Sequence, residues 1–143
     1  MPADFNGTWL NTQVSDSTPR FFAEGLEWNF IQRNLARAAG YGKGKLSHVL
    51  TVSEDGKKVT NTMNMPEEKT FTWIVDGENH EDDGAGNPYK AYWDGDKLVV
   101  QPGEGADPTQ FVMTRYLEGA TMVTELTYPN KPGVEMKRYF EKQ

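Results

Sequence analysis

The chain has 143 residues, of which 36% are hydrophobic and 25% charged, a composition typical of one globular domain rather than of a disordered segment. Its net charge of −6 at neutral pH argues against a nucleic-acid partner, since binding to phosphates requires a concentrated basic surface. The sequence contains no cysteine, which excludes disulfides and thiolate metal sites.

The N-terminus has neither the charged start nor the apolar stretch of a secretory signal. No apolar run approaches the ~20 residues needed to span a membrane. His48 and His80 have no neighbouring histidine or cysteine, so a solvent-facing or hydrogen-bonded role is expected for both rather than metal binding. We therefore expect a single soluble, cytoplasmic domain over residues 1–143, with no cofactor and no metal ion.

The first 40 residues predict one strand followed by two short helices. A first strand is expected over Phe5–Gln13. Thr18 and Pro19 resemble a helix cap followed by proline at the first helical position. A second helix is expected over Glu27–Ala39, because its apolar residues recur at spacings of three and four: Trp28, Ile31, Leu35 and Ala38. Together these segments predict a helical lid over about residues 18–39.

The rest of the chain predicts strands separated by turns. Glycine-containing turn sequences such as Asp76-Gly77 and Glu118-Gly119 punctuate it. The expected strands are Lys45–Ser53, Lys58–Met65, Lys69–Val75, Tyr89–Trp93, Lys97–Pro102, Gln110–Tyr116, Thr121–Tyr128 and Val134–Lys142, with one more near Glu78–Asp82. One strand, a helix pair and an uninterrupted meander favour a barrel capped by helices over a sandwich. A barrel of this size has room for one small ligand.

The last expected strand carries an arginine on its apolar face. Alternation places Val134, Met136, Arg138 and Phe140 on one face, while Glu135, Lys137 and Tyr139 fall on the other. A buried, unpaired charge costs several kcal/mol at least. A bound anion would satisfy Arg138. Two alternatives remain: Arg138 pairs with an internal carboxylate, such as that of Glu125, Glu78 or Glu135, or its side chain extends to solvent at the barrel rim.

Four segments, in the same order and spread over the whole chain, resemble the intracellular lipid-binding proteins, the family of cellular fatty-acid-binding and retinoid-binding proteins. The opening FNGTW resembles the family's F-x-G-T/Y-W, and FIQRNL resembles its second helix. WDGDKL resembles a turn of cellular retinol-binding proteins, and KRYFEK resembles the closing T-R-x-Y-E-K. These segments are residues 5–9, 30–35, 93–98 and 137–142.

The resemblance implies an all-β fold, a ten-stranded antiparallel β-barrel (β-clam) capped by a short helix-turn-helix. It also implies that two arginines, matched here by Arg115 and Arg138, hold the carboxylate of an acidic ligand. In the acid-binding members a tyrosine of the last strand assists them, whereas this chain has Phe140 there, as the retinol-binding members do. The chain therefore mixes the acid-binding and retinol-binding patterns.

Two further groups of residues are candidates for the ligand site. Methionines lie on the expected strands at positions 63, 65, 113, 122 and 136, and either line an adaptable cavity or fill an ordinary core. Trp73 and Phe71, which share one strand face, carry the same two interpretations. We include Met63, Met113, Met136 and Trp73, with Phe140, in the predicted ligand site.

The helices suggest an entrance. Phe21, Phe22, Trp28 and Phe30 are expected to pack mainly on the barrel rim, with a portal as the alternative. Phe30 and Arg33 are the predicted portal residues. Arg33 and Arg37, four residues apart, form either a solvated face or a surface that attracts anionic membranes.

The sequence therefore predicts a monomeric carrier of one hydrophobic monocarboxylate, a long-chain fatty acid or a retinoic-acid-like molecule. Two alternatives remain: a carrier of retinol or retinal, and a structural protein that binds membranes. No nucleophile elbow, phosphate-binding glycine loop or metalloprotease motif occurs, so an enzyme is not expected. The acidic residues Glu78, Glu81, Asp82 and Asp83 are interpreted as an exposed loop. A transient membrane contact is expected for cargo exchange.

Overall fold

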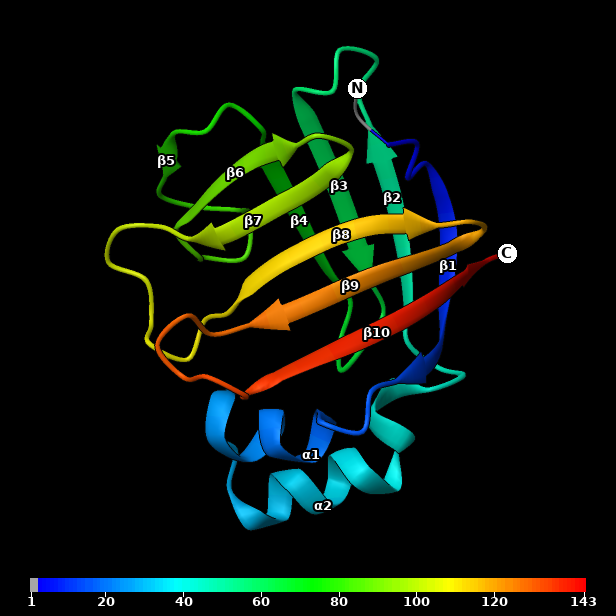
Figure 1. Ribbon diagram of the computed structural model, residues 1–143, viewed down its shortest axis with the longest axis vertical. Helices are drawn as coiled ribbons and strands as arrows, with labels where there is room; N and C mark the ends of the chain where they lie inside the picture. Colours follow the sequence, from blue (N-terminus) through cyan, green and yellow to red (C-terminus); the bar gives the residue numbers. More distant parts are fainter. Residues whose placement is uncertain (1–2) are drawn as a thin grey trace.

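The computed structural model describes residues 3–143, which form a single ten-stranded antiparallel sheet curled into a nearly closed barrel (Figure 1). The strands are β1 (Gly7–Val14), β2 (Ser47–Val52), β3 (Lys58–Met63), β4 (Lys69–Ile74), β5 (Asn79–His80), β6 (Tyr89–Asp94), β7 (Lys97–Pro102), β8 (Val112–Glu118), β9 (Thr121–Thr127) and β10 (Glu135–Lys142). Their order in the sheet is β4-β3-β2-β1-β10-β9-β8-β7-β6-β5. The predicted barrel with a helical cap is confirmed.

The first and last strands pair with each other, which joins the two halves of the chain. Leu10 of β1 lies opposite Glu141 of β10 on one side and Ser47 of β2 on the other. The remaining neighbours in the sheet are also neighbours in the sequence, so most strand pairs need only a short turn. The tenth strand expected near residues 78–82 is the two-residue β5.

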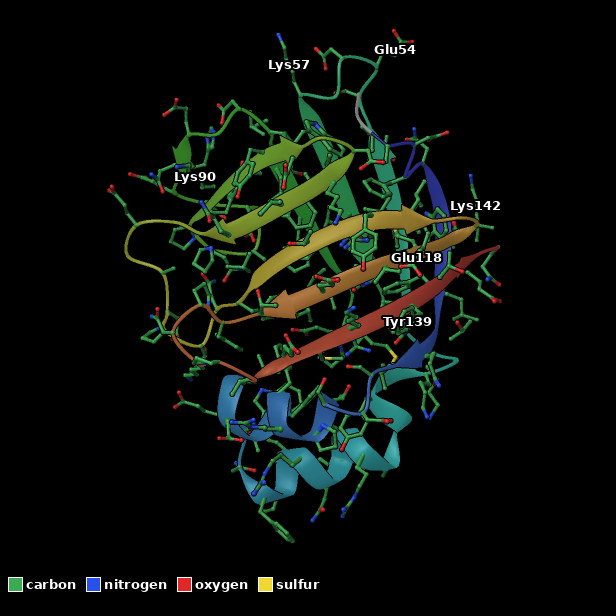
Figure 2. All side chains as sticks on the ribbon, in the orientation of Figure 1. Glu54, Lys57, Lys90, Glu118, Tyr139 and Lys142 are labelled. Carbon is green, nitrogen blue, oxygen red and sulfur yellow. The ribbon has the colours of Figure 1, made fainter. Side chains whose placement is uncertain are left out.

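Among residues 3–143, the sheet has one seam, between β4 and β5, where no strand pairing occurs. Individual hydrogen bonds cross it instead: Thr72 N donates to Asp83 O at 2.7 Å, and Ile74 N donates to the hydroxyl of Tyr89 at 2.8 Å. The indole of Trp93 donates to Gly56 O at 2.8 Å near the far end of the barrel. Figure 2 shows Glu54 and Lys57 extending into solvent from this end, opposite the helices.

The helical segment begins one residue earlier than expected. Ser17 occupies the N-cap position of α1 (Thr18–Arg20), and a single π-helical turn follows over Phe21–Gly25. Thr18 is therefore not the cap; its hydroxyl donates to Ser15 O at 2.7 Å. The segment covers one end of the barrel (Figure 1), and Phe21 and Phe22 are buried there.

The second helix, α2 (Phe30–Ala38), starts later than the predicted Glu27. Glu27 has φ of 57°, a left-handed conformation that ends the preceding turn. Asn29 then caps α2: its side chain accepts from Gln32 N at 2.8 Å, and the Gln32 side chain accepts from Asn29 N at 3.0 Å. This reciprocal capping box fixes the start of the helix.

The apolar side of α2 faces solvent, contrary to expectation. Phe30 is 69%, Ile31 70% and Leu35 67% exposed, and no residue of α2 is buried. The prediction that Phe30 packs on the barrel rim was therefore wrong. At the barrel end, Phe21 and Phe22 of the preceding turn are buried instead. Within residues 3–143, no helix is both long and apolar enough to cross a membrane.

Candidate functional site

Two arginines lie in one row of the sheet, on the inner face of the barrel. Arg115 of β8 and Arg138 of β10 both lie directly opposite Thr124 of β9, one on each side of it. Residues opposite each other in an antiparallel pair share a face. Met136 and Phe140 are buried, whereas Glu135 and Lys137 are exposed, so the predicted alternation of the last strand is confirmed.

Arg115 is fully enclosed and only weakly satisfied. Its side chain is 1% exposed. Both terminal nitrogens lie 3.4 Å from Nδ1 of His48, and they also contact the sulfurs of Met113 at 3.4 Å and Met122 at 3.5 Å. Thioether sulfurs are weak acceptors, and Nε of Arg115 has no partner among residues 3–143. Its charge therefore lacks a strong acceptor in the described protein.

Arg138 is bound by neutral oxygens. One terminal nitrogen donates both to Oδ1 of Asn11, at 2.7 Å, and to the backbone oxygen of Tyr41. None of the three glutamates proposed as internal partners accepts from it. Glu125 accepts instead from the Tyr116 hydroxyl at 2.7 Å and pairs with Lys137 at 3.4 Å, and Glu78 and Glu135 are exposed.

Both guanidinium groups thus carry charge without a counter-ion. Within residues 3–143, neither Arg115 nor Arg138 forms an ion pair. Burial lowers the pKa of Arg115 to about 9 and that of Arg138 to about 10, values that still leave both groups protonated at neutral pH. Two positive charges in a low-dielectric interior create a strong local preference for an anion.

His48 belongs to the same cluster, although it was not among the site residues predicted from the sequence. Burial, reinforced by the charges of Arg115 and Arg138, holds the pKa of His48 well below its usual range. The imidazole is therefore neutral, and its Nδ1 accepts from Arg115. His48 lies on β2, so this contact crosses the barrel interior to the opposite wall.

Asn61 of β3 completes the cluster. It is 3% exposed, and its Nδ2 lies 3.5 Å from Nδ1 of His48. Alternation could have identified both residues, since His48 shares a strand face with Leu50, and Asn61 shares one with Val59. For His48 only a solvent-facing or hydrogen-bonded side chain was expected, and Asn61 was not among the predicted site residues.

The other predicted ligand-site residues divide into two groups. Phe140 lies beside the cluster, its ring centroid 4.8 Å from that of His48. Met113 contacts Arg115, and Met63 lies opposite His48 in the β2–β3 pair. Trp73 and Met136 are buried as well, but no hydrogen bond or ring contact joins them to either arginine; Trp73 stacks on Phe71 at 6.0 Å.

The predicted portal residues border a separate hollow between the helices. It has a volume of about 150 Å³ and is lined by Pro19, Phe22, Phe30, Arg33, Asn34, Arg37 and Tyr41. Nε of Arg33 has no partner among the described residues. Tyr41 links the two regions, because its ring contacts Phe22 at 5.2 Å while its carbonyl accepts from Arg138.

Comparison with known proteins finds similarity in structure only. No family model matches the chain, and no curated protein matches it. The REP1-NXSQ fatty acid transporter superposes with a TM-score of 0.72 at 12% identity, covering 98% of this chain and 96% of its own. Apo lipid binding protein 8 of Caenorhabditis elegans gives 0.67 at 13% identity, with 100% and 99% coverage.

Fatty-acid-binding protein 1 of Echinococcus granulosus gives a TM-score of 0.66 at 16% identity, with 96% of each chain covered. The fluorescent protein UnaG gives 0.68 at 16% identity, with 97% of each chain covered. Four structures matched over almost their whole length agree on one architecture. The chain therefore has the fold of the fatty-acid-binding proteins, as the resemblance of its sequence segments indicated.

Proposed function

We propose that the protein is a monomeric, cytoplasmic carrier that encloses one hydrophobic monocarboxylate, a long-chain fatty acid or a retinoic-acid-like molecule, without making or breaking bonds. One observation carries the proposal: Arg115, which is buried, and Arg138, which is partly buried, are both charged, flank Thr124 and have no counter-ion among residues 3–143. The names of the structural neighbours, which include a fatty acid transporter and a fatty-acid-binding protein, support the same class of ligand.

The energetics favour an acid over a neutral lipid. A ligand carboxylate supplies the anion that Arg115 lacks, and a guanidinium can bind it through two parallel hydrogen bonds. Burial of the apolar tail adds about 0.8 kcal/mol per methylene group. Phe140 has no hydroxyl, so the carboxylate is held without the phenol that acid-binding members of the resembled family use.

A retinol carrier is the second candidate, favoured by Phe140 beside the cluster. A retinol hydroxyl can accept one hydrogen bond from Arg115 but leaves both positive charges without an anion. We therefore rank the acid first. An acid carrier should bind retinoic acid more tightly than retinol, and a retinol carrier should do the reverse. Competition between these two ligands therefore distinguishes the candidates.

The experiment is competition binding to delipidated protein with oleate, all-trans-retinoic acid and all-trans-retinol at one pH. We expect tight binding of an acid and weak binding of retinol. The double variant Arg115→Gln, Arg138→Gln should lose acid binding by about a hundredfold or more, because charge-assisted hydrogen bonds contribute roughly 1.5–3 kcal/mol each. The matched control is Lys137→Gln, which removes an exposed charge from the same strand.

Two results would contradict this proposal. If the double variant binds oleate as tightly as the parent, the arginines do not hold the carboxylate. If retinol alone binds tightly, the neutral acceptors Asn11 and Tyr41 are sufficient partners for Arg138 and the retinol carrier is correct. Weak binding of all three ligands would exclude a carrier of either kind.

We further propose that α2 makes the transient membrane contact through which the ligand is exchanged. Phe30, Ile31 and Leu35 are each about two-thirds exposed, and Arg33 lies beside them. An apolar helix face with adjacent cations is suited to the interface of an anionic bilayer. Changing all three apolar residues to serine should slow ligand transfer to phosphatidylserine vesicles while leaving affinity in solution unchanged.

A structural, membrane-binding role is the alternative to a carrier. It predicts that the ligand-free parent sediments stably with the vesicles, whereas a carrier should bind them only briefly. Sedimentation that is stable and independent of ligand would therefore favour the structural role. The net charge of −6 predicts weak sedimentation, because the anionic surface repels the protein as a whole.

A further inference from the structure

Around His48 and Arg115, the hydrogen-bond donors outnumber the acceptors. Nδ1 of His48 has one lone pair, yet three nitrogens approach it: two from Arg115 at 3.4 Å and Nδ2 of Asn61 at 3.5 Å. An imidazole nitrogen that faces a guanidinium must be an acceptor, because the guanidinium has no acceptor to offer. The donor groups of Arg115 are therefore in excess.

The same reasoning fixes the orientation of Asn61. Since Nδ1 of His48 is an acceptor, the amide must turn its NH₂ group toward it and its oxygen away. That oxygen, Oδ1, is buried and has no donor among residues 3–143. An unpaired buried acceptor is costly. The cluster thus has an unpartnered donor, Nε of Arg115, and an unpartnered acceptor, Oδ1 of Asn61.

We propose that the preferred ligand is a fatty acid with a hydroxyl group on the second or third carbon, whose carboxylate binds Arg115 and whose hydroxyl donates to Oδ1 of Asn61. The proposal rests on the proposed function, because it places the carboxylate at the arginine. Asn61 and Arg115 both approach within 3.5 Å of one nitrogen of His48, so their side chains are close enough for one ligand headgroup to contact both.

The position of the hydroxyl follows from this geometry. A hydroxyl one or two carbons away from the carboxylate carbon can reach Asn61 while the carboxylate stays on Arg115. A hydroxyl at the far end of a long chain cannot, because the tail then extends away from the cluster. An unsubstituted acid satisfies Arg115 but leaves Oδ1 of Asn61 unpaired, and that unpaired acceptor weakens its binding relative to the hydroxy acid.

The test uses four probes of equal chain length on the delipidated full chain: palmitate, 2-hydroxypalmitate, 3-hydroxypalmitate and 16-hydroxypalmitate. We expect the better of the 2- and 3-hydroxy acids to bind about tenfold more tightly than palmitate, as satisfaction of one buried acceptor implies. The 16-hydroxy acid should bind no more tightly than palmitate.

The decisive variant is Asn61→Leu, which has a similar volume and no acceptor. It should abolish the preference for the hydroxy acid, so that palmitate and the 2- and 3-hydroxy acids bind to this variant with equal affinity. The control is Thr62→Val on the same strand, whose hydroxyl lies 3.0 Å from that of Thr70; it should keep the preference. Thermal unfolding of each variant checks that it is folded.

Each outcome bears on one hypothesis. Equal affinity of the parent for palmitate and for the 2- and 3-hydroxy acids overturns the inference but leaves the acid carrier intact. A preference that persists in Asn61→Leu also overturns it, because the hydroxyl then binds elsewhere. Tighter binding of the 16-hydroxy acid than of palmitate also overturns the inference, because the hydroxyl then binds far from the carboxylate site. If none of the four acids binds, the proposed function itself has failed.

Discussion

Nδ1 of His48 lies 3.4 Å from both terminal nitrogens of Arg115, so a neutral histidine on one wall of the barrel is the main acceptor for a charged arginine on the other. This contact joins β2 to β8, which are not neighbours in the sheet. Protonation of His48 would remove the acceptor and add a second cation next to the first. The stability of the ligand-free barrel therefore depends on His48 remaining neutral.

Stability should fall between pH 6.5 and pH 5. The folded protein holds the pKa of His48 well below the ordinary value of 6.5, so below that pH the unfolded chain binds a proton that the folded state does not. The free energy of unfolding then decreases with falling pH by up to about 1.4 kcal/mol per pH unit. Above pH 6.5 this contribution is fully present and does not change.

The measurement is urea unfolding at pH 7.5, 6.5 and 5.5 on the parent and on His48→Gln. Glutamine does not titrate, so the variant should show a clearly smaller decrease than the parent over this range. The lowered pKa values of Asp4, Asp55, Asp76 and Asp107 affect stability only at more acidic pH. Equal slopes in parent and variant would mean that His48 is protonated in the fold.

Arg115→Leu should stabilise the ligand-free protein and abolish acid binding. The arginine is buried with only weak acceptors, and replacing buried charged groups by apolar side chains of similar volume is often neutral or stabilising, by about 1–4 kcal/mol. Chemical denaturation measures the first effect and fatty-acid titration the second. A less stable variant would show that the charge of Arg115 is already compensated within the protein.

Arg138→Leu should have the opposite effect on stability. Arg138 donates to the buried Asn11 and to the carbonyl of the partly buried Tyr41. Its removal leaves both acceptors without this donor, which for a buried acceptor such as that of Asn11 costs about 1–3 kcal/mol. The Tyr41 contact also ties the segment after α2 to the barrel. Trypsin should therefore cleave after the exposed Lys43 or Lys45 faster in the variant, as mass spectrometry can show. Unchanged cleavage would mean that the segment is held by other contacts.

Gly25→Ala should loosen the attachment of the helices to the barrel. A Cβ atom at Gly25 would collide with the ring of Tyr128 and lie 3.1 Å from Val134. Overpacking of this kind typically costs about 1–3 kcal/mol, which thermal unfolding can detect. Adding Tyr128→Leu should recover part of the loss because the collision is relieved. Fully additive losses in the double variant would contradict this explanation.

The barrel was predictable from the sequence because its signals are local. Alternating polarity and turn residues identified the strands, and alternation correctly placed Arg138 on the inner face. The order of one strand, a helix pair and an uninterrupted meander favoured the barrel. The resemblance of short segments supplied the expected role of Arg115, which stays a prediction. The two-residue β5 was expected only as an approximate region, because so short a strand has no periodicity of its own.

The remaining features depend on long-range packing. The start of α2 is set by Asn29 and Gln32 together. The prediction started the helix at Glu27 because the apolar periodicity begins at Trp28. Ile31 and Leu35 face solvent while Phe21 and Phe22 are buried, and the apolar periodicity of a helix does not indicate which of two neighbouring apolar segments packs on the barrel. The meeting of His48 with Arg115 requires two strands 67 residues apart in the chain, and only the folded barrel brings them together.

None of the nine residues of α2 is buried, and this gives the two helical segments different mechanical roles. Isolated helices shorter than about 12 residues are marginal in water, so α2 depends mainly on its capping box and on the segments that flank it. The π-helical turn before it is anchored by Phe21 and Phe22. Amide hydrogens of α2 should consequently exchange through local opening, whereas those of the barrel core should exchange only on global unfolding. The α2 segment can thus open at a free-energy cost far below that of unfolding the barrel.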